Sequence, residues 1–141
     1  MNPDPSQTSA LVMPAPSDPL TRMMLVAIRR MAAHGIRDAH AANMVITTLG
    51  IHFRMPLVLL RAFMLEMAQA SRRSITLAPC YSCRMTRDEE RLMTVLACAN
   101  REPDNAAAAL DQLTAGGLIH PPLSLAATLG DVLAEAGYAM A

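Results

Sequence analysis

The sequence predicts an all-α protein, a single compact bundle of about six helices with a disordered N-terminal tail. Apolar residues recur at helical spacing in six segments, and capping residues, proline or glycine bound each of them. The short β-branched run at residues 74–77 is expected to be an isolated extended piece, because no partner strand is evident. A chain of 141 residues is long enough for one core. We therefore expect one helical domain over residues 18–141.

The N-terminal tail is predicted over residues 1–17, where prolines alternate with polar residues that bury little surface. The rest of the chain has an aliphatic composition. Hydrophobic residues make up 52%, aromatic residues only 3%, and there are twelve methionines and no tryptophan. No apolar stretch reaches the roughly 18 residues of a membrane span, and the N-terminus lacks a signal-peptide pattern. These features predict a soluble cytoplasmic protein with an adaptable, Met-rich core.

The first two helices are predicted from their caps. Asp18 followed by Pro19 is typical of a helix start, and the apolar periodicity continues from there to residues 34–35. Asp38 is expected to cap a second helix that ends near Gly50. Each of these helices has one apolar face to pack.

The third helix is predicted at residues 56–71, with proline at its first position. Its apolar residues surround most of its circumference, which is typical of a central helix contacted from several sides. Thr86 and Glu89 match a capping box for a fourth helix that continues to about residue 100. A fifth is expected at residues 106–113 and a sixth after two consecutive prolines, ending at Gly137.

Five short stretches form a recognisable combination over residues 20–115. They are Ile28-Arg-Arg-Met31, His34-Gly35, Asp38-Ala-His-Ala41, residues 54–61, and Pro79-Cys80 with Cys83-Arg-Met-Thr86. This combination resembles DUF6628, a small family of uncharacterised α-proteobacterial proteins. The resemblance implies a bacterial, sphingomonad-like source. It implies no activity and assigns no functional residue.

The pair Cys80 and Cys83 is the strongest chemical motif. Two thiolates at this spacing would hold one side of a tetrahedral zinc ion, and two further ligands would have to come from Cys98, His34, His40, His52 or His120. The same pair would also suit thiol redox chemistry, with Arg84 and Arg87 favouring the thiolate. The plainer interpretation, which we favour, is that both cysteines are small buried side chains that fix a loop against the bundle.

Charge is distributed unevenly although the net charge is zero. Residues 20–87 hold ten arginines and two acids, whereas residues 88–141 hold eight acids and two arginines. The two halves would attract each other on folding, or the basic half would bind nucleic acid or an acidic partner. The apolar third helix is a poor occupant of a DNA groove. Candidate contacts are Arg29, Arg30, Arg37, Arg72, Arg73, Arg84 and Arg87.

The sequence excludes several common enzyme classes. It contains no Gly-rich phosphate loop, no nucleophile elbow and no His-Glu-x-x-His pair. The interpretation we favour is a small non-catalytic helical protein with a binding or regulatory role, acting through contacts with a protein partner or in a homo-oligomer. The alternatives are a DNA-binding regulator that uses the arginine-rich half and a zinc or thiol-redox protein that uses Cys80 and Cys83.

Overall fold

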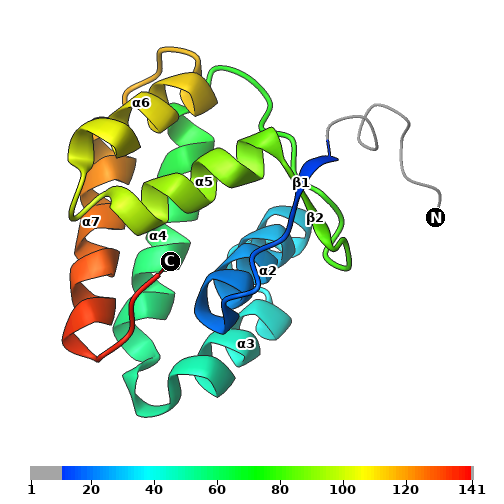
Figure 1. Cartoon of the computed structure of the whole chain (residues 1–141), viewed down its shortest axis with the longest axis vertical. Coiled ribbons are helices and arrows are strands. Elements are labelled where there is room, and N and C mark those ends of the chain that lie inside the picture. The colour runs from blue at the N-terminus through cyan, green and yellow to red at the C-terminus, as the bar shows by residue number, and fades with distance from the viewer. Residues whose placement is uncertain (1–10, 141) are drawn as a thin grey trace.

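The computed structural model describes residues 11–140, which form six α-helices and one two-stranded sheet (Figure 1). The predicted all-α class with about six helices is confirmed. In chain order the elements are β1 (Leu11–Pro14), α2 (Pro19–His34), α3 (Ala39–Leu49), the 3₁₀ turn η1 (Gly50–His52), α4 (Arg54–Ala70), β2 (Arg84–Thr86), α5 (Arg87–Cys98), α6 (Pro103–Thr114) and α7 (His120–Glu135).

Three predicted helix starts are present with the expected caps. The Asp18 carboxylate accepts a hydrogen bond from the Thr21 amide at 2.9 Å, and Asp38 accepts one from the Ala41 amide, also at 2.9 Å. The capping box that opens α5 is complete in both directions. Each cap satisfies an amide that the helix itself leaves without a partner, which stabilises the helix by about 1 kcal/mol.

The helices pack mainly in three neighbouring pairs. Helix α4 lies along α7, α5 lies along α6, and α2 lies along α3, while α5 also crosses α7 (Figure 1). Phe63 of α4 is fully buried and is the largest of the side chains buried in the core. The Met-rich interior predicted from composition is present: the buried methionines are Met23, Met24, Met31, Met67, Met85, Met93 and Met140.

The first described residues differ from the predicted flexible tail. Residues 1–10 of that tail lie outside the described residues, but β1 pairs antiparallel with β2. The Ala15 amide then donates to the carbonyl oxygen of Cys83 at 2.8 Å. Order therefore begins before Asp18. Backbone hydrogen bonds hold this segment. A strand this short shows too little side-chain periodicity to be predicted from the sequence.

Helix α4 contacts α7, α2 and α3, as predicted for a central helix contacted from several sides, but its apolar circumference is not fully covered. It begins at Arg54, two residues before Pro56, and one of its faces is open to solvent. Met55 is 52% exposed and Val58 is 56% exposed. Apolar residues around most of a helix do not ensure burial around most of it. No helix among the described residues is long and apolar enough to cross a membrane.

Candidate functional site

A buried ion pair lies where α2 meets the start of α5. The Arg29 Nε of α2 donates to Glu89 Oε2 at 2.6 Å, and Nη2 donates to Oε1 at 3.0 Å. The two side chains are 1% and 0% exposed. A charged pair at this depth offsets its desolvation only when every polar atom has a partner. Whether this ion pair stabilises the fold therefore depends on the other hydrogen bonds that its two side chains make.

Those remaining bonds hold the segment that carries the two cysteines, residues 78–84, here called the cysteine loop. Arg29 Nη1 donates to the Ser82 carbonyl and Nη2 to the Arg84 carbonyl, both at 2.9 Å. The Glu89 carboxylate accepts from the amides of Ala78 and Thr86. Both ends of the loop are thus fastened to one buried pair. These contacts hold the loop in one conformation.

Asp88, next along α5, fastens the chain just before the cysteine loop. Its carboxylate accepts from Arg73 at 2.6 Å and 3.0 Å, from Arg91 at 3.1 Å and from the Thr76 amide at 2.9 Å. Burial raises the pKa of Asp88, but the hydrogen bonds from Arg73 and Thr76 outweigh it and hold that pKa below its ordinary value. The carboxylate is therefore ionised at neutral pH and keeps its partners.

The cysteines do not pack as we favoured, because Cys83 is exposed and Cys80 is only half-buried. Both thiols are free. The two cysteines lie in and next to a turn in which the Ser82 amide donates a hydrogen bond to the Pro79 carbonyl oxygen at 3.0 Å. Arg30 lies beside this turn: its hydrogen bond to Asp38 raises the pKa of the guanidinium, and a weaker contact with Cys80 adds to that effect.

The structure does not assemble the candidate zinc ligands around this pair. Cys98 is the last residue of α5, about 18 Å along the helix from its start. His52 instead faces Tyr138 edge-on at 6.5 Å, and His120 begins α7. Within residues 11–140, no group of three or more His, Cys, Asp or Glu side chains is placed to hold a metal ion.

The candidate arginine contacts fall into two groups. Arg29, Arg30 and Arg73 are engaged in ion pairs, two of which join the basic half to the acidic half. Attraction between the halves of one chain therefore accounts for part of the charge asymmetry. Arg37, Arg72, Arg84 and Arg87 are exposed.

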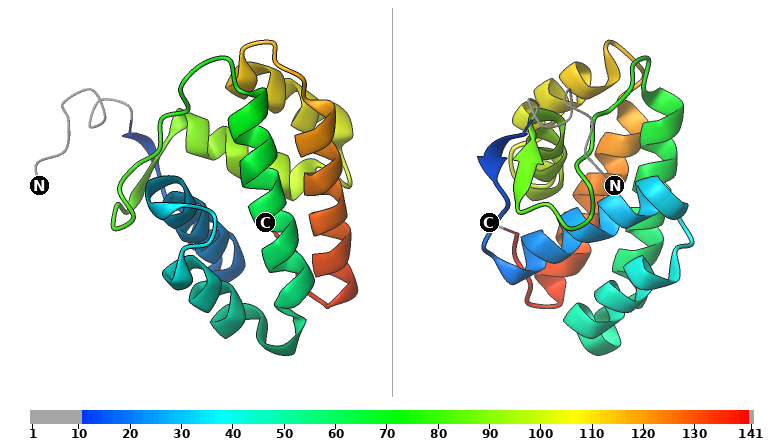
Figure 2. Two further views of the ribbon diagram at one scale, coloured as in Figure 1. Left: turned by 180° about the vertical axis from the view of Figure 1, so that it is seen from behind. Right: turned by 90° about the vertical axis from the view of Figure 1, so that its right-hand side faces the viewer.

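A second feature lies on the open face of α4 and was missed in the sequence. When the molecule is seen from behind relative to Figure 1, α4 lies towards the viewer (Figure 2, left). Three large apolar side chains of α4 are between 46% and 56% exposed, Ala62 lies between them, and Ile51 of η1, just before the helix, is 90% exposed. We call this set the α4 stripe. Its members are Ile51, Met55, Val58, Ala62 and Leu65.

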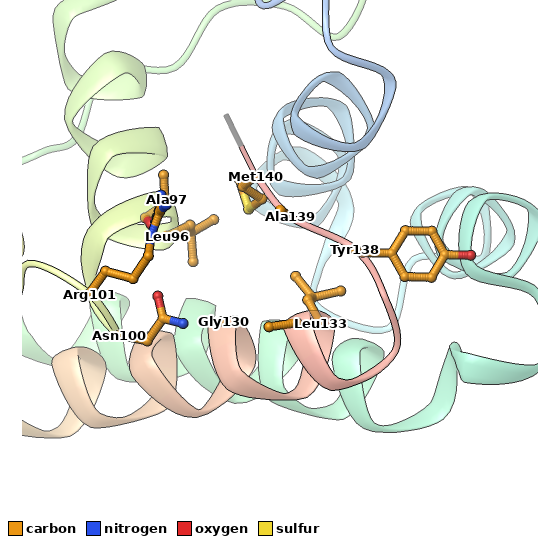
Figure 3. A pocket seen from close by; sticks show the side chains of 10 residues that line it. Leu96, Ala97, Asn100, Arg101, Gly130, Leu133, Tyr138, Ala139 and Met140 are labelled. Atoms are coloured by element: carbon orange, nitrogen blue, oxygen red, sulfur yellow. Dashed lines mark hydrogen bonds between the residues drawn. The ribbon is translucent and has the colours of Figure 1, made fainter.

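Two hollows accompany these features. A cavity of about 80 Å³ lies between α5, α7 and the C-terminal segment, with Asn100 and Arg101 at one side and Tyr138 directed away from them (Figure 3). It is too small for an organic ligand. A groove of about 420 Å³ runs between α2 and α4 and is lined largely by apolar side chains, among them Met31, Met64 and Met67.

Comparison with protein families matches the chain along nearly its whole length. A model described as a family of unknown function, DUF6628, covers residues 4–137. The chain belongs to the DUF6628 family. This confirms the family resemblance found in the sequence. No curated protein and no solved structure matches this DUF6628 protein.

Proposed function

We propose that this DUF6628 protein acts by binding another polypeptide, as a non-catalytic regulatory or accessory module, and that the α4 stripe is its contact surface. One observation carries the proposal. Three large apolar side chains, Met55, Val58 and Leu65, are exposed along one face of a single helix, α4. Scattered apolar residues on a surface need no explanation, whereas a contiguous apolar row usually marks an interface.

The neighbouring structure favours a polypeptide over a small ligand at this surface. A hollow of about 300 Å³ lies beside Ile51 and Met55, but the rest of the stripe follows the exposed face of one helix, and small-molecule sites are concave. A helix packs against a ridge of this kind by placing its side chains between the exposed ones. Methionine at position 55 adds a flexible side chain that adapts to the shape of a partner.

Photocrosslinking tests this proposal in the cell. A photoreactive amino acid in place of Val58 is expected to give a discrete covalent adduct with a protein, because this side chain would lie inside the contact. The same amino acid in place of exposed Asp111 on α6 serves as the matched control. The adduct is expected to disappear when Leu65→Glu is added. Equal, diffuse labelling from both positions would contradict the proposal.

A second candidate function is thiol chemistry in a reducing cytoplasm, favoured by the two free thiols of the cysteine loop, Cys83 exposed and Cys80 half-buried. Access to solvent is one requirement of a reactive thiol. We expect Cys83 to be alkylated by a maleimide faster than Cys98, which is half-buried at the end of α5. A rate at Cys83 no faster than that at Cys98 would contradict this candidate.

A further inference from the structure

The α4 stripe has the spacing of a coiled-coil seam. From Met55 the row continues through Val58, Ala62 and Leu65 to Gln69, so the steps alternate between three and four residues. This alternation keeps one row of side chains facing a partner helix along two heptads. Ala62, in the middle of the row, allows two helices to approach closely. The seam fits another helix of similar length.

The charges beside this seam fit the same helix of a second copy. Arg61 precedes Ala62 and Glu66 follows Leu65, so the two flank the row on opposite sides. When two α4 helices pair in parallel, Arg61 of each copy faces Glu66 of the other. The antiparallel alignment with the greatest overlap, Val58 over Ala62, brings the two Arg61 side chains together instead. Opposite charges therefore favour the parallel arrangement.

The α4 helix is available for this pairing. It is already folded within its own bundle, so association does not have to meet the cost of forming a helix. The Arg61 Nε donates to the Ile36 carbonyl at 3.0 Å. In the described part of the chain its two terminal nitrogens make no hydrogen bond, and Glu66 forms no ion pair. Both charges are left free to reach across an interface.

We propose that two copies of this chain form a parallel, two-fold symmetric dimer through the α4 stripe, with Arg61 of each copy paired to Glu66 of the other. This inference rests on the proposed function, since it uses the same surface and names its occupant. The partner is a second copy of this chain, and the row from Met55 to Leu65 meets its own counterpart.

Disulfide trapping tests the geometry. All three natural cysteines are replaced by serine, and single cysteines are introduced as Val58→Cys, Leu65→Cys or, as a control on α6, Asp111→Cys. In the parallel dimer each stripe residue faces itself, so the first two variants each form a covalent dimer and the control does not. Thermal melting by circular dichroism checks that every background is folded. Trapping that requires a mixture of Val58→Cys and Ala62→Cys chains would overturn the parallel arrangement.

Light scattering coupled to size-exclusion chromatography tests the association itself. The purified chain is expected at twice its 15.2 kDa mass, and Val58→Glu at the single mass with an unchanged melting profile. In Glu66→Arg, each of the two symmetry-related pairs at the interface would bring two arginines together. This variant is expected to raise the dimer dissociation constant about fivefold. A wild-type monomer at high concentration and low salt would overturn the dimer.

The two proposals fail differently. If the chain is a monomer but Val58 still gives an adduct with a different protein in the cell, the dimer is wrong and the proposed function stands. If the chain is a monomer and Val58 gives no adduct, both are wrong. An adduct of twice the chain mass together with a dimer in light scattering supports both.

Discussion

Arg29 is the residue on which the cysteine loop most depends. Its guanidinium uses three nitrogens to reach Glu89 and two loop carbonyls, and all of these contacts are buried or half-buried. A charge this deep has no water to replace a lost partner. The conformation of the cysteine loop, residues 78–84, therefore depends on these contacts of Arg29.

Replacing Arg29 tests that dependence. We expect Arg29→Met to lower the free energy of unfolding by about 3–5 kcal/mol, because it leaves the Glu89 carboxylate buried without its counter-charge. The double variant Arg29→Met/Glu89→Gln should recover part of that loss, since a neutral amide needs no counter-charge. Urea denaturation followed by circular dichroism measures both. Additive losses in the double variant would show that the two side chains act independently.

The contacts of Glu89 show how far the sequence could predict this site. Its local contact with Thr86 was predicted, since a capping box is written in four consecutive residues. Its contact with Arg29 spans 60 residues of chain. Nothing in a single sequence distinguishes this arginine from its half-buried neighbour Arg30, whose side chain is 24% exposed. The same limit applies to the cysteines, whose spacing was visible while their exposure was not.

Among the elements, α4 was located well and interpreted poorly. Its apolar residues predicted a helix over nearly the right range, contacted from several sides, but they did not indicate that one apolar face stays open. The helix packs chiefly along α7, and other elements meet it more lightly. Periodicity reports which faces a helix could bury, whereas the number and position of its neighbours decide which face remains open. The α4 stripe is the apolar face of α4 that no neighbouring element among residues 11–140 covers.

The α6–α7 connection approaches the end of α4 so closely that only glycine fits. A Cβ atom added at Gly117 would lie 1.9 Å from the Ala70 carbonyl oxygen, a backbone atom that cannot rotate away. We expect Gly117→Ala to destabilise the protein by about 3 kcal/mol or more. Gly130→Ala is the matched control, because its nearest neighbour at 2.8 Å is the Asn100 side chain, which is able to move.

Thermal and urea unfolding of these two glycine variants gives the comparison. The expected change for Gly130→Ala is within about 1 kcal/mol, since alanine is favoured over glycine inside a helix and offsets part of the crowding. A loss of stability in Gly130→Ala as large as that in Gly117→Ala would contradict the assigned difference between backbone and side-chain contacts.

For the whole molecule, acid should weaken the attachment between its two halves. Burial raises the pKa of Asp88, but its bonds to Arg73 and Thr76 outweigh that effect and hold the pKa below the ordinary value of 3.8. A carboxylate with a lowered pKa contributes its full stability above pH 3.8. The contribution declines below that pH and is lost once the pH has fallen through the folded-state pKa.

Unfolding measured as a function of pH checks this expectation. The wild type should lose the contribution of the Asp88 charge as the pH falls below 3.8, whereas Asp88→Asn should be less stable at neutral pH and lose less on acidification. The difference between the two proteins should therefore shrink as the pH falls. A constant difference at all pH values would mean that the Asp88 charge does not contribute to stability.

The position of the partners along the chain has a consequence for synthesis on the ribosome. Arg29 emerges 60 residues before Glu89, and α4 emerges well before α7, the helix along which it packs. A nascent chain that ends at residue 100 lacks α6 and α7, the main packing partners of α5 and α4, and leaves those apolar faces uncovered. We expect a fragment of residues 1–100 to be cleaved by a protease as fast as an unfolded chain. That result would mean that stable folding waits for the synthesis of α7.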